Sequence, residues 1–401
     1  MKIYPPKLKE VGNKIILISD FETDTYSNSL WYEFDIEYKK HLVTEQSDAF
    51  VVGLLLLAFK LKEDIYIEGS ISARLKYQLN YYLIPALCIA FKEFNKIQVF
   101  SEEESELILS NDNCQSATGI SCGVDSLATL MEHEKMKGLL AISHLTYLNA
   151  GSHSDFGSVF GRELFDEKYR KIVEFGKEIN KSVIKIDTNL SELLQMRFIT
   201  SHTLRNISCI LNLQKLFKSY YYASAFRFDQ FEINSRISDL YDLLTLQMVS
   251  TESVRFYSSL SDKTREERTR LISKYQIAFD YLDVCVDPKS AKGKINCSKC
   301  SKCMRTQITL DVFGSLNFFN NVFDMEVYQR HKNKYISGLI VNKKRSKMDK
   351  NVWNLLVQNN YKITFLHFAV AWMIILEEKT NNLKKFVKSL LLKKKKYKTF
   401  K

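Results

Sequence analysis

Apolar residues in the first hundred positions recur with two different periods. Short apolar runs predict β-strands at residues 15–19, 65–68 and 97–100. Apolar side chains at helical spacing predict helices over residues 48–61 and 73–94. A polar run at residues 101–113, rich in Glu, Ser and Asn, is typical of a linker. We therefore expect an N-terminal α/β accessory domain over residues 1–112.

The pattern then changes to short strands separated by segments long enough for helices. Strands are predicted at residues 116–120, 139–148, 182–186 and 220–224. Alternating strands and helices favour an α/β fold, a Rossmann-like parallel sheet with helices on both faces. This domain is expected over residues 113–314, and residues 315–401 are expected to form a helical extension with a basic tail.

Length and composition narrow the class of protein. With 401 residues and 45% hydrophobic side chains, the chain can bury a substantial core. The longest apolar stretch, residues 50–59, has about half of the roughly 20 residues of a membrane-spanning helix. We expect a cytoplasmic protein with no membrane partner, in which cysteines stay reduced unless they bind metal.

The charge is uneven along the chain. The formal net charge is +12, and much of the excess lies in Lys384, Lys385, Lys388 and Lys393 to Lys396. Such a tail is usually solvated, although a protein or nucleic-acid partner could bind it or the N-terminal domain.

Four of the eight cysteines lie close together in the sequence: Cys285, Cys297, Cys300 and Cys303. Two-residue spacings let a tight turn direct successive sulfurs toward one metal ion. Four thiolates leave no open coordination position, so this pattern predicts a structural Zn²⁺ site. An iron–sulfur cluster remains the alternative, although nothing else in the sequence suggests redox chemistry.

A glycine turn follows the predicted strand at residues 116–120 and opens a helix. It consists of Ser121, Cys122, Gly123, Val124, Asp125 and Ser126. Unpaired amides at the start of a helix bind anions, and the two serine hydroxyls can bind phosphate oxygens. Asp125 can hold Mg²⁺ or orient the loop. The turn lacks the Gly-Lys-Ser/Thr of a Walker loop, and an ordinary helix cap is the competing interpretation.

These six residues resemble the Ser-Gly-Gly-x-Asp-Ser signature of PP-loop ATPases, with Cys122 in place of a glycine. A PP-loop followed by Cys-x11-Cys-x2-Cys-x2-Cys is similar to 7-cyano-7-deazaguanine synthases. Thr203, Leu204, Arg205 and Asn206 resemble that family's Arg-Asn element, and Asp229 resembles part of its acidic substrate-side loop. Ser250, Thr251 and Glu252 resemble its Lys-Ala-Glu, without the lysine. The resemblance covers residues 114–310.

The resemblance implies an AMP-forming C–N ligase that uses ATP, Mg²⁺ and Zn²⁺. Residues 121–126 and Asn206 would bind the nucleotide, and Asp125 and Arg205 would be catalytic. The acceptor would be a deazapurine-like small molecule or a macromolecule, adenylated for attack by ammonia or an amine. Two alternatives stay open: a tRNA-thiolating PP-loop enzyme, in which Cys122 or Cys209 would react, and an inactive nucleotide-binding scaffold in a defence or modification system.

Overall fold

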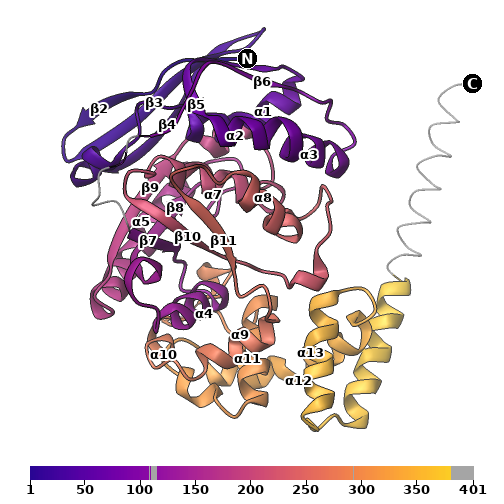
Figure 1. Ribbon diagram of the computed structural model, residues 1–401. Helices are drawn as coiled ribbons and strands as arrows, with labels where there is room; N and C mark the ends of the chain where they lie inside the picture. The colour runs from indigo at the N-terminus through magenta and orange to yellow at the C-terminus, as the bar shows by residue number, and fades with distance from the viewer. Residues whose placement is uncertain (108, 110–114, 292, 381–401) are drawn as a thin grey trace, which may run out of the picture. The chain divides into compact units, whose positions relative to one another are not determined.

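A computed structural model describes residues 1–107, 109, 115–291 and 293–380 of the chain. It divides into two compact units, Met1–Arg268 and Thr269–Lys401. All strands of the described residues lie in the first unit (Figure 1): β1 (Lys2–Ile3), β2 (Lys7–Val11), β3 (Lys14–Glu22), β4 (Ser27–Asp35), β5 (Ile65–Ser72), β6 (Val99–Ser105), β7 (Gln115–Gly119), β8 (Ile142–Asn149), β9 (Ser182–Thr188), β10 (Phe217–Ala223) and β11 (Arg255–Ser259).

The helices of the first unit connect or cover these strands. They are α1 (Asp48–Leu61), α2 (Ala73–Gln78), α3 (Ile84–Ala90), α4 (Val124–His133), α5 (Val159–Glu178), α6 (Leu190–Leu194), α7 (His202–Leu211) and α8 (Asp242–Met248). A ninth, α9 (Arg265–Ile272), continues across the boundary between the units. The second unit contains α10 (Ala278–Tyr281), α11 (Ser301–Val312), α12 (Met325–Asn342), α13 (Lys347–Gln358) and a helix over residues 365–380.

The strands form one sheet in the order β11-β10-β7-β8-β9-β4-β3-β1-β5-β6, with β2 paired to β3. From β11 to β9 all neighbours are parallel, whereas β4 pairs with β9, and β3 with β4, in antiparallel fashion. The protein is therefore a mixed α/β protein with a large, mostly parallel sheet, as the sequence predicts. Strands from both sides of residue 112 belong to this sheet.

The strand order reverses at β7. The chain proceeds from β7 to β8 and β9 on one side, then returns to place β10 and β11 on the other side. Because such crossovers are right-handed, the reversal puts α4 and α5 on one face of the sheet and α7 and α8 on the other. Because β7, β10 and β11 are parallel neighbours, their carboxyl ends lie at the same edge of the sheet.

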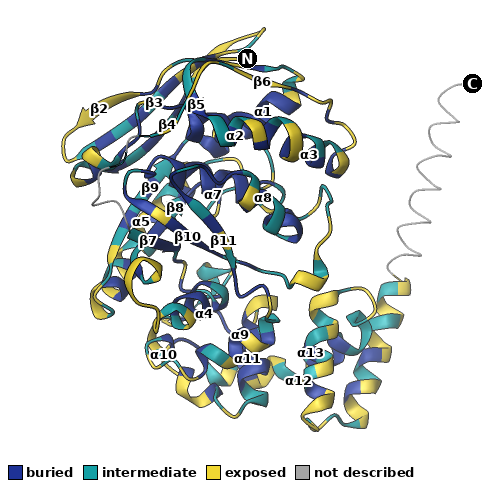
Figure 2. Ribbon diagram, viewed as in Figure 1, coloured by how far each residue is buried: buried dark blue, intermediate teal, exposed yellow. Residues whose placement is uncertain are grey.

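The apolar stretch at residues 50–59 is the most buried helix of the first unit. Every residue of α1 from Asp48 to Phe59 is buried (Figure 2), and α1 contacts α7, α6 and β5. This packing explains an apolar helix without a polar face, since a helix that is hydrophobic on all sides must be covered on all sides. Among the described residues, no helix has the length and apolar character needed to cross a membrane.

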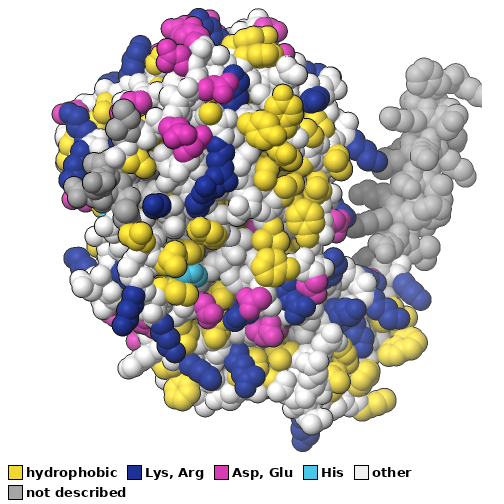
Figure 3. All heavy atoms as spheres, in the orientation of Figure 1, with side chains coloured by type: hydrophobic (Ala, Val, Ile, Leu, Met, Phe, Trp, Pro, Cys, Tyr) yellow, Lys and Arg dark blue, Asp and Glu magenta, His cyan; other side chains and the backbone are white. Residues whose placement is uncertain are grey.

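The structure differs from the predicted elements between residues 73 and 113. The single helix predicted over residues 73–94 is divided by a π-helical turn at Leu79–Leu83 and ends at Ala90. Residues 101–105 of the predicted linker belong to β6, and residues 108 and 110–113 lie outside the described part. The exposed apolar side chains of Tyr77, Tyr81, Tyr82 and Ile89 gather over α2 and α3 (Figure 3).

Candidate functional site

The glycine turn joins β7 to α4 where the strand order reverses. Strand β7 ends at Gly119, and α4 begins at Val124 with Gly123 in the N-cap position. The Oγ atoms of Ser121 and Ser126 lie 3.4 Å apart, the amide of Gly123 donates to Ser121 Oγ (3.3 Å), and Ser126 Oγ donates to the carbonyl of Gly123 (3.1 Å). The first amides of an α-helix are not used by its own hydrogen-bond ladder, and at the start of α4 the hydroxyls of Ser121 and Ser126 lie beside them in sequence.

Cys122 adopts a backbone conformation that favours glycine. Its φ of 53° lies in the left-handed region, where glycine has no steric cost. Its side chain is only 3% exposed. The small thiol is thus packed into the protein and leaves the backbone of the turn in the shape that a glycine would give it.

Two arginines bind the carboxylate of Asp125. Arg265 Nη1 lies 2.6 Å from Asp125 Oδ2, and Arg268 Nη1 lies 3.1 Å from Oδ1. Arg265 is partly exposed, whereas Arg268 is fully buried. Asp125 therefore orients its loop through ion pairs, and a cation bound to this carboxylate would compete with both guanidinium groups.

Arg268 joins the ends of three strands. Besides Asp125 after β7, its guanidinium donates to the carbonyl of Ser224 after β10 and to that of Leu260 after β11, the latter over 2.7 Å. Its Nε has no hydrogen-bond partner among the described residues. The sequence analysis missed Arg265 and Arg268, because a separation of 140 residues or more gives no local signal of the contact with Asp125.

Arg205 lies on α7 and binds backbone and hydroxyl oxygens. Its guanidinium donates to the carbonyls of Ala150 (3.3 Å), Asp155 (3.2 Å) and Met196 (2.7 Å), and to Ser191 Oγ (3.3 Å). Burial lowers the pKa of Arg205 to about 10. The arginine thereby holds the loop that follows β8.

Gly151 leaves room for the guanidinium group of Arg205 beside the loop after β8. It has a φ of 120°, and a Cβ added there would lie 2.5 Å from Arg205 Nη1. Asn206, the next residue on α7, is partly buried, and its side chain bonds the hydroxyl of Tyr222 at the end of β10. The Arg-Asn pair thus contacts the ends of β8 and β10, beside the strand that carries the glycine turn.

A buried acid–base cluster lies near the same edge. His202 Nε2 is 3.0 Å from Asp239 Oδ1, and its Nδ1 is 2.8 Å from the hydroxyl of Tyr222. Burial alone would lower the pKa of His202, but the carboxylates of Asp239 and Asp242 raise it. Burial and the neighbouring Asp239 raise the pKa of Asp242 to about 7. Oδ2 of Asp242 has no hydrogen-bond partner among the described residues.

Two other segments singled out in the sequence lie elsewhere. Ser250, Thr251 and Glu252 precede β11 and so lie at its amino end. The glycine turn follows the carboxyl end of β7, so it lies at the other end of these parallel strands. Glu252 accepts from Ser72 Oγ and from the amide of Arg74, and thereby caps α2. Asp229 is exposed and pairs with Arg227.

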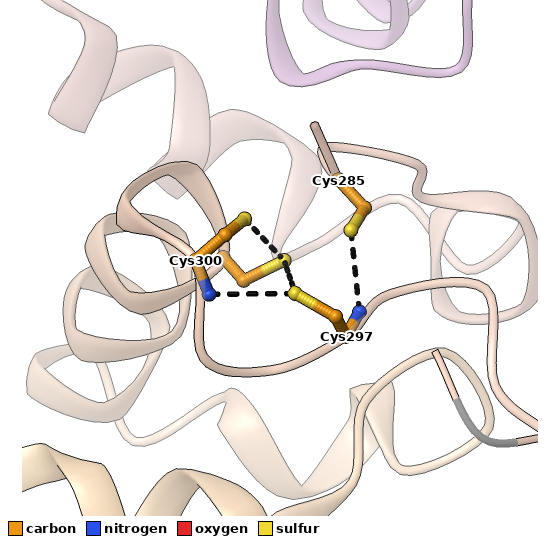
Figure 4. Close-up of side chains that lie close together, drawn as sticks. Cys285, Cys297 and Cys300 are labelled. Atoms are coloured by element: carbon orange, nitrogen blue, oxygen red, sulfur yellow. Dashed lines mark hydrogen bonds between the residues drawn. The ribbon is translucent and has the colours of Figure 1, made fainter. Parts of the chain in front are cut away.

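The four clustered cysteines come together in the second unit. Their Sγ atoms all lie within 4.8 Å of one another, a geometry that can hold a metal ion. Cys300 Sγ and Cys303 Sγ are 3.3 Å apart, and Cys297 Sγ and Cys303 Sγ are 3.9 Å apart (Figure 4). These separations exceed a disulfide bond and approach the ~3.8 Å between sulfurs of a tetrahedral site with bonds of about 2.3 Å.

Two loops and a helix start supply the sulfurs. Cys300 caps α11, Cys303 lies in its first turn, and the amides of Cys297 and Asp287 donate to Cys285 Sγ over 3.4 and 3.3 Å. Buried Asn296 accepts from the amide of Val284 and donates to the carbonyl of Leu282, over 2.9 and 2.7 Å. This asparagine fixes the spacing between the loops, and the sequence analysis missed it.

No protein-family model, curated protein or solved structure matches the chain. The function of the two sites is therefore argued from their chemistry.

Proposed function

We propose that the chain is a PP-loop enzyme with a Rossmann-like fold, which cleaves ATP between its α and β phosphates and transfers AMP to an acceptor oxygen. The observation that carries this proposal is the position of residues 121–126. They link the central strand of a parallel sheet to a helix at the reversal of strand order, the place where such sheets bind ligands. Hydroxyls, helix amides and two arginines meet there, which suits a polyphosphate.

Different residues of the chain would bind the pyrophosphate of ATP and position the surrounding loops. The amides of Gly123 and α4, with Ser121 and Ser126, would hold the pyrophosphate of ATP. Arg205 would be a positioning residue, since its donors already bind the loop after β8. Positioning and electrostatic stabilisation suffice for transfer of a phosphoryl-type group, which needs little acid–base chemistry from the protein.

Magnesium is the cofactor that ATP chemistry at this loop implies. Asp125 is the carboxylate at the turn, but both of its oxygens bind arginines. A magnesium ion at Asp125 therefore requires the partly exposed Arg265 to move away. The guanidinium group of Arg265 would then face a phosphate group. Bound magnesium would neutralise negative charge on the phosphates.

For the acceptor, we propose a carboxylate or amide of deazapurine type, activated by AMP for attack by ammonia or an amine. The resemblance of residues 121–126 and of the four-cysteine spacing to 7-cyano-7-deazaguanine synthases supports this choice. The four sulfurs would hold Zn²⁺ as a structural ion, because a complete thiolate set leaves no position for water.

The test follows AMP and pyrophosphate released from ATP in the presence of 7-carboxy-7-deazaguanine and ammonium. We expect AMP formation that requires the deazaguanine and falls by at least about tenfold in Ser121→Ala, since preorganised donors contribute strongly to transition-state stabilisation. Ser121 is exposed, so the variant should fold. Ser27→Ala, at an exposed position of β4, is the matched control. ADP as product would contradict the proposal.

A second candidate, a nucleotide-binding scaffold without turnover, is favoured by the occupied carboxylate of Asp125. Binding of ATP to the wild-type protein with no pyrophosphate release under any acceptor would select it. The structure gives less support to tRNA thiolation, which needs a reactive thiol. Cys122 and Cys209 are both buried, and burial raises the pKa of Cys209 far above its usual value.

A further inference from the structure

The helix over residues 365–380 exposes a continuous apolar face. Six large apolar side chains on it are between 43% and 86% exposed: Phe365, Leu366, Phe368, Trp372, Met373 and Leu376. Phe365, Trp372 and Leu376 are seven and four residues apart, so they lie along one side of the helix. A solvent-exposed stripe of this size on a protein surface marks an interaction site.

The opposite side of this helix is attached to α12. His367 and Ala371 are buried there, and His367 Nε2 lies 3.3 Å from Asn333 Oδ1. Arg345 and Glu378 form an ion pair of 2.8 Å at the other end. Because these contacts fix the helix about its own axis, the apolar face has to point outward from the second unit.

Basic residues flank the apolar face in the sequence, and Glu377 and Glu378 are the acidic residues of this helix. Lys362 and Lys379 are exposed at the two ends of the helix. From residue 381 to residue 401 the sequence contains nine lysines and no acidic residue. Figure 3 shows basic and apolar side chains together on the surface formed by α12 and α13. The partner of this region should therefore offer both negative charge and an apolar phase.

Three kinds of partner differ in how many of these features they use. A nucleic acid would pair with the lysines but would leave the Phe, Trp and Leu side chains in water. A second copy of the chain would cover the apolar face but would bring two sets of lysines together. A bilayer surface with anionic lipids accepts apolar side chains at the acyl boundary and lysines among the headgroups.

We propose that residues 365–380 lie in the surface of membranes that contain anionic lipids, with Phe365, Trp372 and Leu376 inserted. This proposal departs from the expectation of no membrane partner, which rested on the length of the apolar stretch. A helix that lies on a membrane needs no spanning length, so the absence of a spanning helix among the described residues is compatible with this mode of binding. The proposal is independent of the function proposed for the glycine turn.

The test is sedimentation of the full chain with vesicles of phosphatidylcholine mixed with phosphatidylserine, and with vesicles of phosphatidylcholine alone. We expect binding to the mixed vesicles only, accompanied by a blue shift of Trp fluorescence that disappears in Trp372→Phe. The double variant F365E/L376E should abolish binding. Ile89→Glu, which charges an equally exposed apolar position in the first unit, is the matched control and should bind normally.

A second variant, with Lys393, Lys394, Lys395 and Lys396 all replaced by Gln, should bind at least about tenfold more weakly, since each lysine near an anionic surface contributes. No binding to the mixed vesicles would overturn the proposal. So would binding that F365E/L376E leaves unchanged, because the lysines alone would then explain it. A wild-type dimer that F365E/L376E converts to a monomer would assign the face to a second copy.

Discussion

At the scale of single residues, Arg268 determines the shape of the candidate nucleotide site. Its guanidinium binds a side chain after β7 and two carbonyls after β10 and β11, so one buried cation holds three strand ends together. A buried charge is costly unless it is paired, and the pairing here is nearly complete. Local sequence cannot reveal such a group, because Asp125 and Ser224 are distant from it in the chain.

Replacing Arg268 with Met should therefore destabilise the protein strongly. We expect the free energy of unfolding to fall by about 3 kcal/mol, because Asp125 loses its buried partner and two carbonyls lose their donor. Arg270→Met, on the exposed side of the same helix, should change it by less than about 1 kcal/mol. Urea unfolding of both variants measures this difference, and equal effects would argue against the role assigned to Arg268.

Asp242 makes stability depend on pH. In an unfolded chain an aspartate loses its proton near pH 4, whereas burial raises the pKa of Asp242 in the folded protein to about 7. Between these values the folded state binds the proton more tightly, so stability should fall as pH rises. The raised pKa of His202 has the same sign, since its stabilising charge is lost as pH rises through that pKa.

Asp242→Asn removes the ionisation but keeps the shape of the side chain. We expect it to raise the free energy of unfolding by roughly 2 kcal/mol at pH 8 and to change it little at pH 5. Asp239→Asn is the contrasting control, because it removes the ion-pair partner of His202 and should destabilise the protein at pH 5. Urea unfolding at pH 5 and pH 8 measures the free energy of unfolding of each variant. An equal effect of Asp242→Asn at both pH values would contradict a raised pKa of Asp242 in the folded protein.

At the scale of elements, apolar patterning predicted most of the sheet. Strands β8 to β10 and helix α1 were found from their apolar residues, because a parallel strand that is buried on both faces has a continuous apolar run. Strand β7, with one apolar residue in Gln-Ser-Ala-Thr-Gly, was found from the glycine turn and helix that follow it. Strand β11 was missed, since its sequence Arg-Phe-Tyr-Ser-Ser is half polar, and so was β4. The joining of N-terminal strands to the sheet through β4 and β9 depends on long-range pairing, which no local pattern encodes.

The same limit applies to the candidate site. The six residues of the glycine turn and the four cysteines are short motifs, so spacing alone predicted that each would gather in one place. Arg265, Arg268 and Asp242 reach the end of the sheet only because the strand order brings β10 and β11 beside β7. Order within the sheet was not predicted, and the partners of Asp125 could not be predicted without it.

At the scale of the whole molecule, the two candidate sites belong to different compact units. The glycine turn lies within Met1–Arg268, whose core is built from α1, α7 and the sheet. The four cysteines lie within Thr269–Lys401, where they connect the loops before α11 to that helix. A structural metal stabilises the segment that supplies its ligands, so metal loss should act on one unit and not on the other.

Hydrogen exchange after treatment with a chelator tests this separation. We expect faster exchange over residues 282–312 once the metal is removed, because four cysteine thiols without a metal no longer fix the two loops to α11. Amides of α1 and β7 should keep their protection, since their packing involves only the first unit. Cys297→Ser should reproduce the change, whereas Cys88→Ser, outside the cluster, should not. Exchange that is unaltered by the chelator in a protein shown to contain one metal ion would mean that the cysteines do not stabilise this unit through metal.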